Sequence, residues 1–272
     1  MREASDRLPK PMVPIGDRPI LWHVMKYYAH FGHKQFVLCL GYRAEMVKNY
    51  FLNYSEALSN DFVLTNGGKE IDLLNHDIQD WEISFVSTGM HSNIGERLRS
   101  VKKHLEGEEY FLANYGDVLT DAPLPDQIHR LRQEDKIASF LCVRPNYTFH
   151  LVDFDANDKI RRLQESTSSD IWINGGYFAF RHDVFDYIGD GDDLVEAPFA
   201  RLIEGNQLIA QKHHGFWAPM DTLKDKQNLE NLLENGKSPW RVWENGEPAA
   251  ADLAPLPSDA AGEGPATSAT TS

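Results

Sequence analysis

The chain has 272 residues and a formal net charge of −14. This length suits one large α/β domain, which would bury roughly 70–75% of the surface of its unfolded chain. The negative charge argues against nucleic acid or an anionic membrane as the main partner, because both would repel it. A nucleotide is not excluded, since a few local cations and a metal ion suffice for one triphosphate.

The two cysteines each lie in an apolar run, FVLCLG around Cys39 and SFLCVR around Cys142. They indicate buried thiols of a reducing compartment, so we expect a cytoplasmic protein. No apolar run is long enough to span a bilayer, and no signal peptide is seen.

The first stretch with a distinct pattern covers residues 6–28. Its early prolines fix the backbone and remove donors, which excludes a helix or an inner strand and predicts a stiff, extended loop that presents Lys10. A turn is predicted at Gly-Asp 16–17. An amphipathic helix should then start at Pro19 and end near Gly32. Taken alone, Lys10 would be an exposed lysine in a connector.

Beyond that helix, short apolar strands alternate with helices. This order predicts right-handed βαβ units and an α/β fold, a Rossmann-like mostly parallel sheet flanked by helices. An Asn-Gly-Gly turn at 66–68 predicts a hairpin in the same half. The predicted strands are residues 35–40, 61–65, 70–74, 83–86, 110–114 and 138–143, and the predicted helices lie near 43–51, 96–105 and 124–134.

After residue 150 the links between strands become short, which predicts a smaller antiparallel extension on the sheet. Its strands are residues 152–155, 160–163 and 173–180, followed by helices near 195–204 and 223–235 with a strand at 208–213 between them. We expect one domain over residues 1–244. Residues 245–272 are rich in Ala, Pro, Gly, Ser and Thr. They cannot bury enough surface to offset the entropy of ordering, so a disordered tail is expected.

Two aspartates are candidate metal ligands. Asp117 follows the strand 110–114 in a Tyr-Gly-Asp turn, at the edge where open parallel sheets bind ligands, and Asp221 lies in Trp-Ala-Pro-Met-Asp-Thr. Singly, Asp117 could be a turn residue and Asp221 a helix N-cap. As a pair about 4 Å apart they would repel by on the order of 4 kcal/mol, a conflict that bound Mg²⁺ would remove.

These motifs, with Pro-Lys-Pro-Met at 9–12, resemble the sugar-1-phosphate nucleotidyltransferases. Gly-Tyr at 41–42 and Pro-Trp-Arg-Val-Trp at 239–243 are similar to the glucose-1-phosphate cytidylyltransferase branch. The resemblance implies a nucleotide-diphospho-sugar transferase type of fold, whose antiparallel extension binds the sugar. It also implies that Asp117 and Asp221 hold a catalytic Mg²⁺ and that Lys10 contacts phosphate.

The resemblance further implies substrate contacts. The backbone at Gly95 would read the base, Gly116 would lie beside the metal site, and the sugar hydroxyls would contact Glu165, Asn174, Gly175 and Gly176. In the implied reaction a sugar 1-phosphate oxygen attacks the α-phosphorus of a triphosphate, CTP being favoured, and pyrophosphate leaves. The attacking phosphate is already mostly dianionic at neutral pH, so no general base is needed. Relatives are commonly oligomeric, so a homo-oligomer is expected.

Several positions depart from the family pattern. The family's Gly-Gly-x-Gly-Thr-Arg phosphate loop and the strand before it do not occur ahead of Lys10. Either the start of the chain was assigned too late, or the main phosphate cradle is lost. We therefore expect the chain as written to be poorly stable and nearly inactive. The sugar half departs at Val118, at Phe-His 149–150 and at Ser166, where relatives carry a phosphate-binding lysine.

These departures leave alternatives open. The acceptor could be another sugar 1-phosphate, or the protein could be a degenerate member that binds a sugar nucleotide or partner subunits without turnover. Arg161 or Arg162 could replace the lost lysine, although each is more simply a solvated strand residue. Arg97 and Arg99 are expected on a solvated helix face, with a smaller chance of nucleotide contact, and the histidines at 213–214 are expected to be a surface pair.

Overall fold

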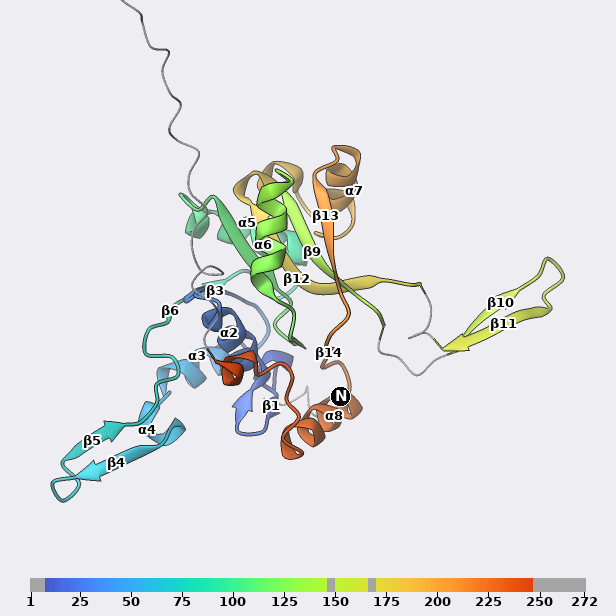
Figure 1. Ribbon diagram of the computed structural model, residues 1–272. Coiled ribbons are helices and arrows are strands. Elements are labelled where there is room, and N and C mark those ends of the chain that lie inside the picture. Colours follow the sequence, from blue (N-terminus) through green and yellow to red (C-terminus); the bar gives the residue numbers. More distant parts are fainter. Residues whose placement is uncertain (1–7, 146–149, 166–169, 247–272) are drawn as a thin grey trace, which may run out of the picture.

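The centre of the computed structural model is a four-stranded mixed sheet in the order β13–β9–β12–β7 (Figure 1). The structure describes residues 8–145, 150–165 and 170–246. Strand β9 is parallel to β13, and β12 is antiparallel to both of its neighbours. The bounds are β7 Tyr110–Asn114, β9 Ala138–Val143, β12 Ile173–Arg181 and β13 Leu208–His213.

Two further strands, β3 (Gln35–Leu40) and β6 (Glu82–Ser87), form a separate parallel pair. Within the described residues, β3 is hydrogen-bonded only to β6 and β7 only to β12, so each has one open edge. An open edge exposes a row of unpaired N–H and C=O groups. The α/β prediction is confirmed. In the described residues the strands of the predicted sheet are divided between the mixed four-stranded sheet and the parallel β3–β6 pair.

Helices and hydrophobic clusters cover both faces of the four-stranded sheet. Successive side chains on a strand point to opposite faces. On β12, Tyr177 therefore joins a cluster with Tyr27 and Leu124, whereas Phe178 and Phe180 join a second cluster on the other face. The helices are α2 Ile20–His30, α3 Ala44–Leu52, α4 Glu56–Ser59, α5 Ile94–Val101, α6 Leu124–Gln133, α7 Ala197–Glu204 and α8 Leu223–Glu234, and the 3₁₀ turns include η2 Lys102–Leu105, η4 His182–Tyr187 and η5 Val242–Asn245.

The segment around Lys10 corrects the prediction of an extended loop. Lys10–Met12 form a 3₁₀ turn, η1, and Pro14–Ile15 (β1) pairs with Arg18–Pro19 (β2). A proline in the first turn of a helix is tolerated, because its φ fits and its missing N–H would be unpaired there anyway. Helix α2 follows as predicted, but it is buried on nearly all sides rather than on one face.

The predicted antiparallel extension is only partly as expected. Residues 173–181 belong to an inner strand of the main sheet, β12. In the described part of the chain the other two strands, β10 (His150–Phe154) and β11 (Ile160–Glu165), pair only with each other, and they project from the body in Figure 1. A second two-stranded ribbon, β4 (Phe62–Thr65) with β5 (Glu70–Leu73), projects on another side and is the hairpin predicted around residues 66–68.

Two predictions fall outside the described residues: the tail beyond residue 246 and the departures at residues 149 and 166. In the described part of the chain, no helix combines the length and the apolar character needed to cross a bilayer.

His23 lies in the core on α2 and is 2% exposed. One ring nitrogen, Nε2, lies 3.1 Å from the carbonyl oxygen of Ile15, and the other, Nδ1, faces the indole N–H of Trp240 at 3.4 Å. This arrangement suits a neutral ring that donates to the first group and accepts from the second. Burial lowers the pKa of His23 to about 4.

We expect the protein to lose stability between pH 6.5 and pH 4. The unfolded chain protonates His23 near its ordinary pKa, whereas the folded protein resists protonation until about pH 4, so acid favours unfolding by about 3 kcal/mol in total. The melting temperature should therefore drop less from pH 7 to pH 4.5 in His23→Gln than in the wild type. The exposed His104→Gln is the control. An equal acid effect in all three proteins would contradict this assignment.

Candidate active site

A short antiparallel ladder brings the two predicted metal ligands together. Strand β8 (Val118–Thr120) pairs with β14 (Trp217–Pro219), and Val118 lies opposite Pro219. Asp117 comes directly before β8, and Asp221 comes two residues after β14. The backbone N–H of Met220 donates to the carbonyl oxygen of Asp117 at 2.9 Å, which extends the ladder to the two aspartates.

Lys10 lies between the two carboxylates. Its Nζ is 2.7 Å from Oδ1 of Asp221 and 3.7 Å from Oδ2 of Asp117. Burial disfavours the charged ammonium, but the hydrogen bond to Asp221 and the two negative charges outweigh it and raise the pKa of Lys10. The side chain of Asp117 is 19% exposed, and burial raises its pKa against the opposing attraction of Lys10. The structure thus unites all three residues predicted as catalytic.

The structural roles that could have explained these aspartates belong to neighbours. Thr222 is the N-cap of α8, and its side chain accepts from the N–H of Asp225, so Asp221 does not cap the helix. The turn before Asp117 is closed by Asn114, whose Oδ1 accepts from the N–H of Gly116 at 2.6 Å. Gly116 has φ +84°, a conformation that favours glycine. The carboxylate of Asp221 therefore does not serve as the helix N-cap, and that of Asp117 does not close the turn.

The donor set of this site fits a magnesium ion. Mg²⁺ prefers hard oxygen ligands and usually binds through one or two carboxylates, with water and substrate phosphates completing its coordination. Asp117 and Asp221 supply two such carboxylates, and a cation, Lys10, already lies between them. No group of three or more His, Cys, Asp or Glu side chains with metal-binding geometry occurs in the described ranges, so a metal here would depend on substrate for its remaining ligands.

The predicted sugar-binding segment, residues 174–176 at the start of β12, lies against the turn of the metal site. The amide of Asn174 donates to the hydroxyl of Tyr115 at 2.9 Å, and the indole N–H of Trp217 donates to the carbonyl oxygen of Gly175 at 2.8 Å. Gly176 has φ +76°, and a Cβ built there would lie 2.6 Å from the ring of Tyr115. The glycine therefore allows β12 to touch the turn at Tyr115, which keeps residues 174–176 near Asp117.

The substrate contacts predicted for Gly95 and Glu165 do not follow from the structure. A Cβ on Gly95 would lie 2.2 Å from the carbonyl oxygen of Asp192, so close packing at the start of α5 already requires a glycine. Its contact with a base stays a prediction. Glu165 ends β11 on the projecting ribbon, and its side chain lies outside the described part. Its role in sugar binding also stays a prediction.

Two side chains differ from the solvated roles expected for them. Arg97 donates to the hydroxyl of Thr88 at 2.9 Å, and a Cβ on Gly41 would lie 2.8 Å from its guanidinium. It therefore lies at the carboxyl ends of β3 and β6, where open sheets bind ligands. His213 is 11% exposed in its side chain and lies 2.7 Å from a carboxylate oxygen of Asp121. Arg99, paired with the exposed Asp190, is solvated as expected.

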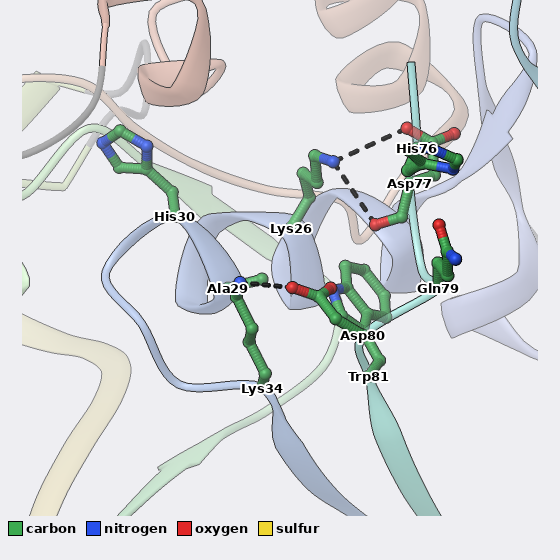
Figure 2. Close-up of a pocket in the computed structure, with 9 residues that line it drawn as sticks. All are labelled: Lys26, Ala29, His30, Lys34, His76, Asp77, Gln79, Asp80 and Trp81. Carbon is green, nitrogen blue, oxygen red and sulfur yellow. Dashed lines mark hydrogen bonds and ion pairs between the residues drawn. The ribbon is translucent and has the colours of Figure 1, made fainter. Parts of the chain in front are cut away.

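A separate pocket of about 330 Å³ lies beside α2 (Figure 2). Its lysines are neutralised within the pocket, since Lys26 lies 3.5 Å from a carboxylate oxygen of Asp77 and Lys34 pairs with Asp80. None of its lining residues is a predicted site residue, so the pocket adds nothing to the site around Lys10.

Comparison with known proteins identifies the family of this chain. The glucose-1-phosphate cytidylyltransferase of Salmonella typhi is 37% identical over 238 residues, which cover 87% of this chain and 92% of the relative. A probable glucose-1-phosphate cytidylyltransferase of Bacillus subtilis is 34% identical over 245 residues, 89% of this chain and 95% of the relative. The chain belongs to the sugar-1-phosphate nucleotidyltransferase family. It is therefore a nucleotidyltransferase enzyme, as its motifs predict.

Solved structures share the fold of this nucleotidyltransferase. An apo UDP-glucose pyrophosphorylase matches with a TM-score of 0.61 at 14% identity, over 87% of this chain and 94% of that one. A putative glucose-1-phosphate thymidylyltransferase from Bacillus anthracis matches with a TM-score of 0.58 at 14% identity, over 85% of this chain and 89% of that one. No family model matches the chain.

Proposed function

We propose that this enzyme transfers a cytidylyl group from CTP to a sugar 1-phosphate, with glucose 1-phosphate as the first candidate, and releases pyrophosphate. The observation that carries the proposal is the position of Lys10 between Asp117 and Asp221. CTP and glucose 1-phosphate are supported by the names of the Salmonella and Bacillus relatives.

The chemistry needs positioned charges rather than a nucleophilic side chain. A phosphate oxygen of the sugar forms the new bond to the α-phosphorus, and the bond from that phosphorus to the leaving pyrophosphate breaks. Asp117 and Asp221 would hold Mg²⁺, which when bound offsets charge on the phosphates. Lys10 would offset the charge that shifts during transfer. The turn at Gly116 and the β12 segment 174–176 would hold the sugar phosphate next to these groups, which raises its effective concentration.

We place the enzyme in the cytoplasm as an assembly of identical subunits. Cys39 and Cys142 are free thiols, which suits a reducing compartment. Both projecting ribbons expose apolar side chains on one face, and an isolated two-stranded ribbon is marginally stable in water. These side chains include Phe62, Leu64, Ile71, Phe154, Ile160 and Leu163. Contact with other copies would bury them.

Pyrophosphate release should identify both substrates. The full chain is incubated with Mg²⁺ and glucose 1-phosphate, together with CTP, UTP, dTTP, ATP or GTP in turn. We expect slow release with CTP, at least tenfold faster than with any other triphosphate. Release with another triphosphate alone would overturn the choice of base. Silence with every triphosphate and with a panel of other sugar 1-phosphates would overturn the proposed reaction.

A second candidate is a family member that binds a sugar nucleotide without turnover. The open edges of β3 and β7 and the departures in the sugar half favour it. It predicts that the folded protein binds CDP-glucose in calorimetry yet releases no pyrophosphate. The retained arrangement of Lys10, Asp117 and Asp221 favours catalysis, so transfer is our first choice.

A further inference from the structure

Trp172 lies beside two cationic side chains. The guanidinium carbon of Arg144 is 5.4 Å from the centre of its indole ring, and Nζ of Lys212 is 4.7 Å from it. The ring of His214 meets the indole edge-on at 5.1 Å. The indole N–H is buried and has no hydrogen-bond acceptor among the described residues. Side chains from separate segments of the chain thus place hydrogen-bond donors and positive charge around the indole ring of Trp172.

The positive charge of this cluster is largely uncompensated. Among the described residues Arg144 pairs with one carboxylate, that of Asp170 at 3.9 Å, and this aspartate is 95% exposed, so the pair is weak. Within the described ranges, Lys212 forms no ion pair. Cation–π contacts offset some of the repulsion between the two cations but add no negative charge. In a chain of net charge −14, such a local excess of cations is a fit for an anionic ligand.

The topology places the cluster on the edge of the sheet that carries the active site. Strands β7, β9 and β13 run in the same direction, because β12 is antiparallel to both β7 and β9. Asp117 follows β7, Arg144 follows β9, Lys212 lies near the end of β13, and Trp172 precedes the start of β12. With strands about 4.8 Å apart, Arg144 and Lys212 lie two and three strand spacings from β7, roughly 10–14 Å.

That separation decides which group the cluster can bind. An attacking oxygen must approach the phosphorus to about 3–3.5 Å, so the reacting phosphate belongs at Lys10, Asp117 and Asp221. A group bound by Arg144 and Lys212 lies farther away, so it is a second group of the bound molecule rather than the reacting phosphate. The β12 segment 174–176, implied to bind the sugar, follows Trp172 in the chain, and the amide of Asn174 donates to the hydroxyl of Tyr115.

We propose that Arg144 and Lys212, gathered around Trp172, bind a second anionic group of the acceptor, so that the preferred acceptor is a sugar 1-phosphate with a further phosphate or carboxylate. The inference rests on the proposed function, because it assigns the anion to the acceptor sugar. Arg144 offers a planar fork of donors that matches phosphate and carboxylate oxygens, and Lys212 adds a compact charge.

Calorimetry on the full chain tests the site without turnover. Glucose 1-phosphate is compared with glucose 1,6-bisphosphate and with glucuronic acid 1-phosphate, which separates a second phosphate from a carboxylate. We expect at least one of the doubly anionic sugars to bind about tenfold more tightly than glucose 1-phosphate. The preference should vanish in Arg144→Gln/Lys212→Gln. It should persist in the charge-conserving Arg144→Lys/Lys212→Arg and in the distant control Lys69→Gln/Lys103→Gln.

Equal affinity for all three sugars in the wild type would overturn the inference, as would a preference that survives in Arg144→Gln/Lys212→Gln. Pyrophosphate release is measured separately on the same proteins. Release with glucose 1-phosphate but no binding preference would leave the proposed function intact and reject the second-anion site. A preference that depends on Arg144 and Lys212 in a protein that releases no pyrophosphate would support the second-anion site and reject the proposed function.

Discussion

Replacing Asp117 by Asn should lower kcat/KM for nucleotidyl transfer by about 10²–10³-fold, the usual loss when one group that stabilises transition-state charge is removed. Asn keeps the size of the side chain but loses the charge, so it binds a divalent cation poorly and leaves Lys10 with one carboxylate partner instead of two. The measurement is pyrophosphate release at varied CTP and sugar phosphate, on a protein whose melting temperature is recorded in parallel.

Asp221→Asn should behave similarly, and Asp117→Asn/Asp221→Asn should be little worse than either single variant. Residues that hold one group together act as a unit, so their effects do not add. Asp61→Asn, an exposed carboxylate at the base of the β4–β5 ribbon, is the control with the same change of charge. Wild-type kcat/KM in a folded Asp117→Asn protein would rule out the metal role of this carboxylate.

The sequence predicts which residues form this site better than it predicts how the chain brings them together. Lys10, Asp117 and Asp221 each lie in a recognisable motif, and all three meet in the structure. The ladder that joins the aspartates was missed, because β8 and β14 have three residues each and are too short to show a periodic pattern. Its pairing also joins segments far apart in the chain, which no local pattern reports.

The elements with long apolar patterns were predicted well, and the exceptions have local causes. The 3₁₀ turn at Lys10 is not predicted, because closely spaced prolines argue against a helix. The first turn of a helix nevertheless tolerates them. Helix α2 appeared amphipathic, but polar-looking positions such as His23 are buried by the C-terminal aromatic residues. That packing depends on residues beyond 238, which a helical pattern within α2 cannot reveal.

The cluster at Trp172 could not be predicted from local sequence either. Arg144, Trp172 and Lys212 belong to three different segments, and no local pattern joins them. Only the order of the strands places them on one edge of the sheet. Arg97 is a similar case: Gly41 follows β3, and the space beside this glycine is filled only when α5 brings Arg97 to it.

Replacing Trp240 by Ala should destabilise the fold by about 3–5 kcal/mol, the usual cost of removing a large buried side chain. Trp240 is 1% exposed, its ring lies 5.5 Å from that of Phe216, and its indole N–H faces His23. In a chain of this size each kcal/mol lowers the melting temperature by about 2–4 °C, so a drop of roughly 6–20 °C is expected in a thermal melt.

The same variant shows how the C-terminal segment supports catalysis. Trp240 packs on Phe216, which directly precedes β14, and β14 positions Asp221. Loss of the ring should therefore loosen the β8–β14 ladder, so kcat should fall at temperatures well below the melting transition. Leu223→Ala, at a site 53% exposed, is the control and should change the melting temperature by no more than 1–2 °C, roughly 0.5 kcal/mol. A Trp240→Ala protein that melts with the wild type would show that residues 238–243 do not belong to the folded core.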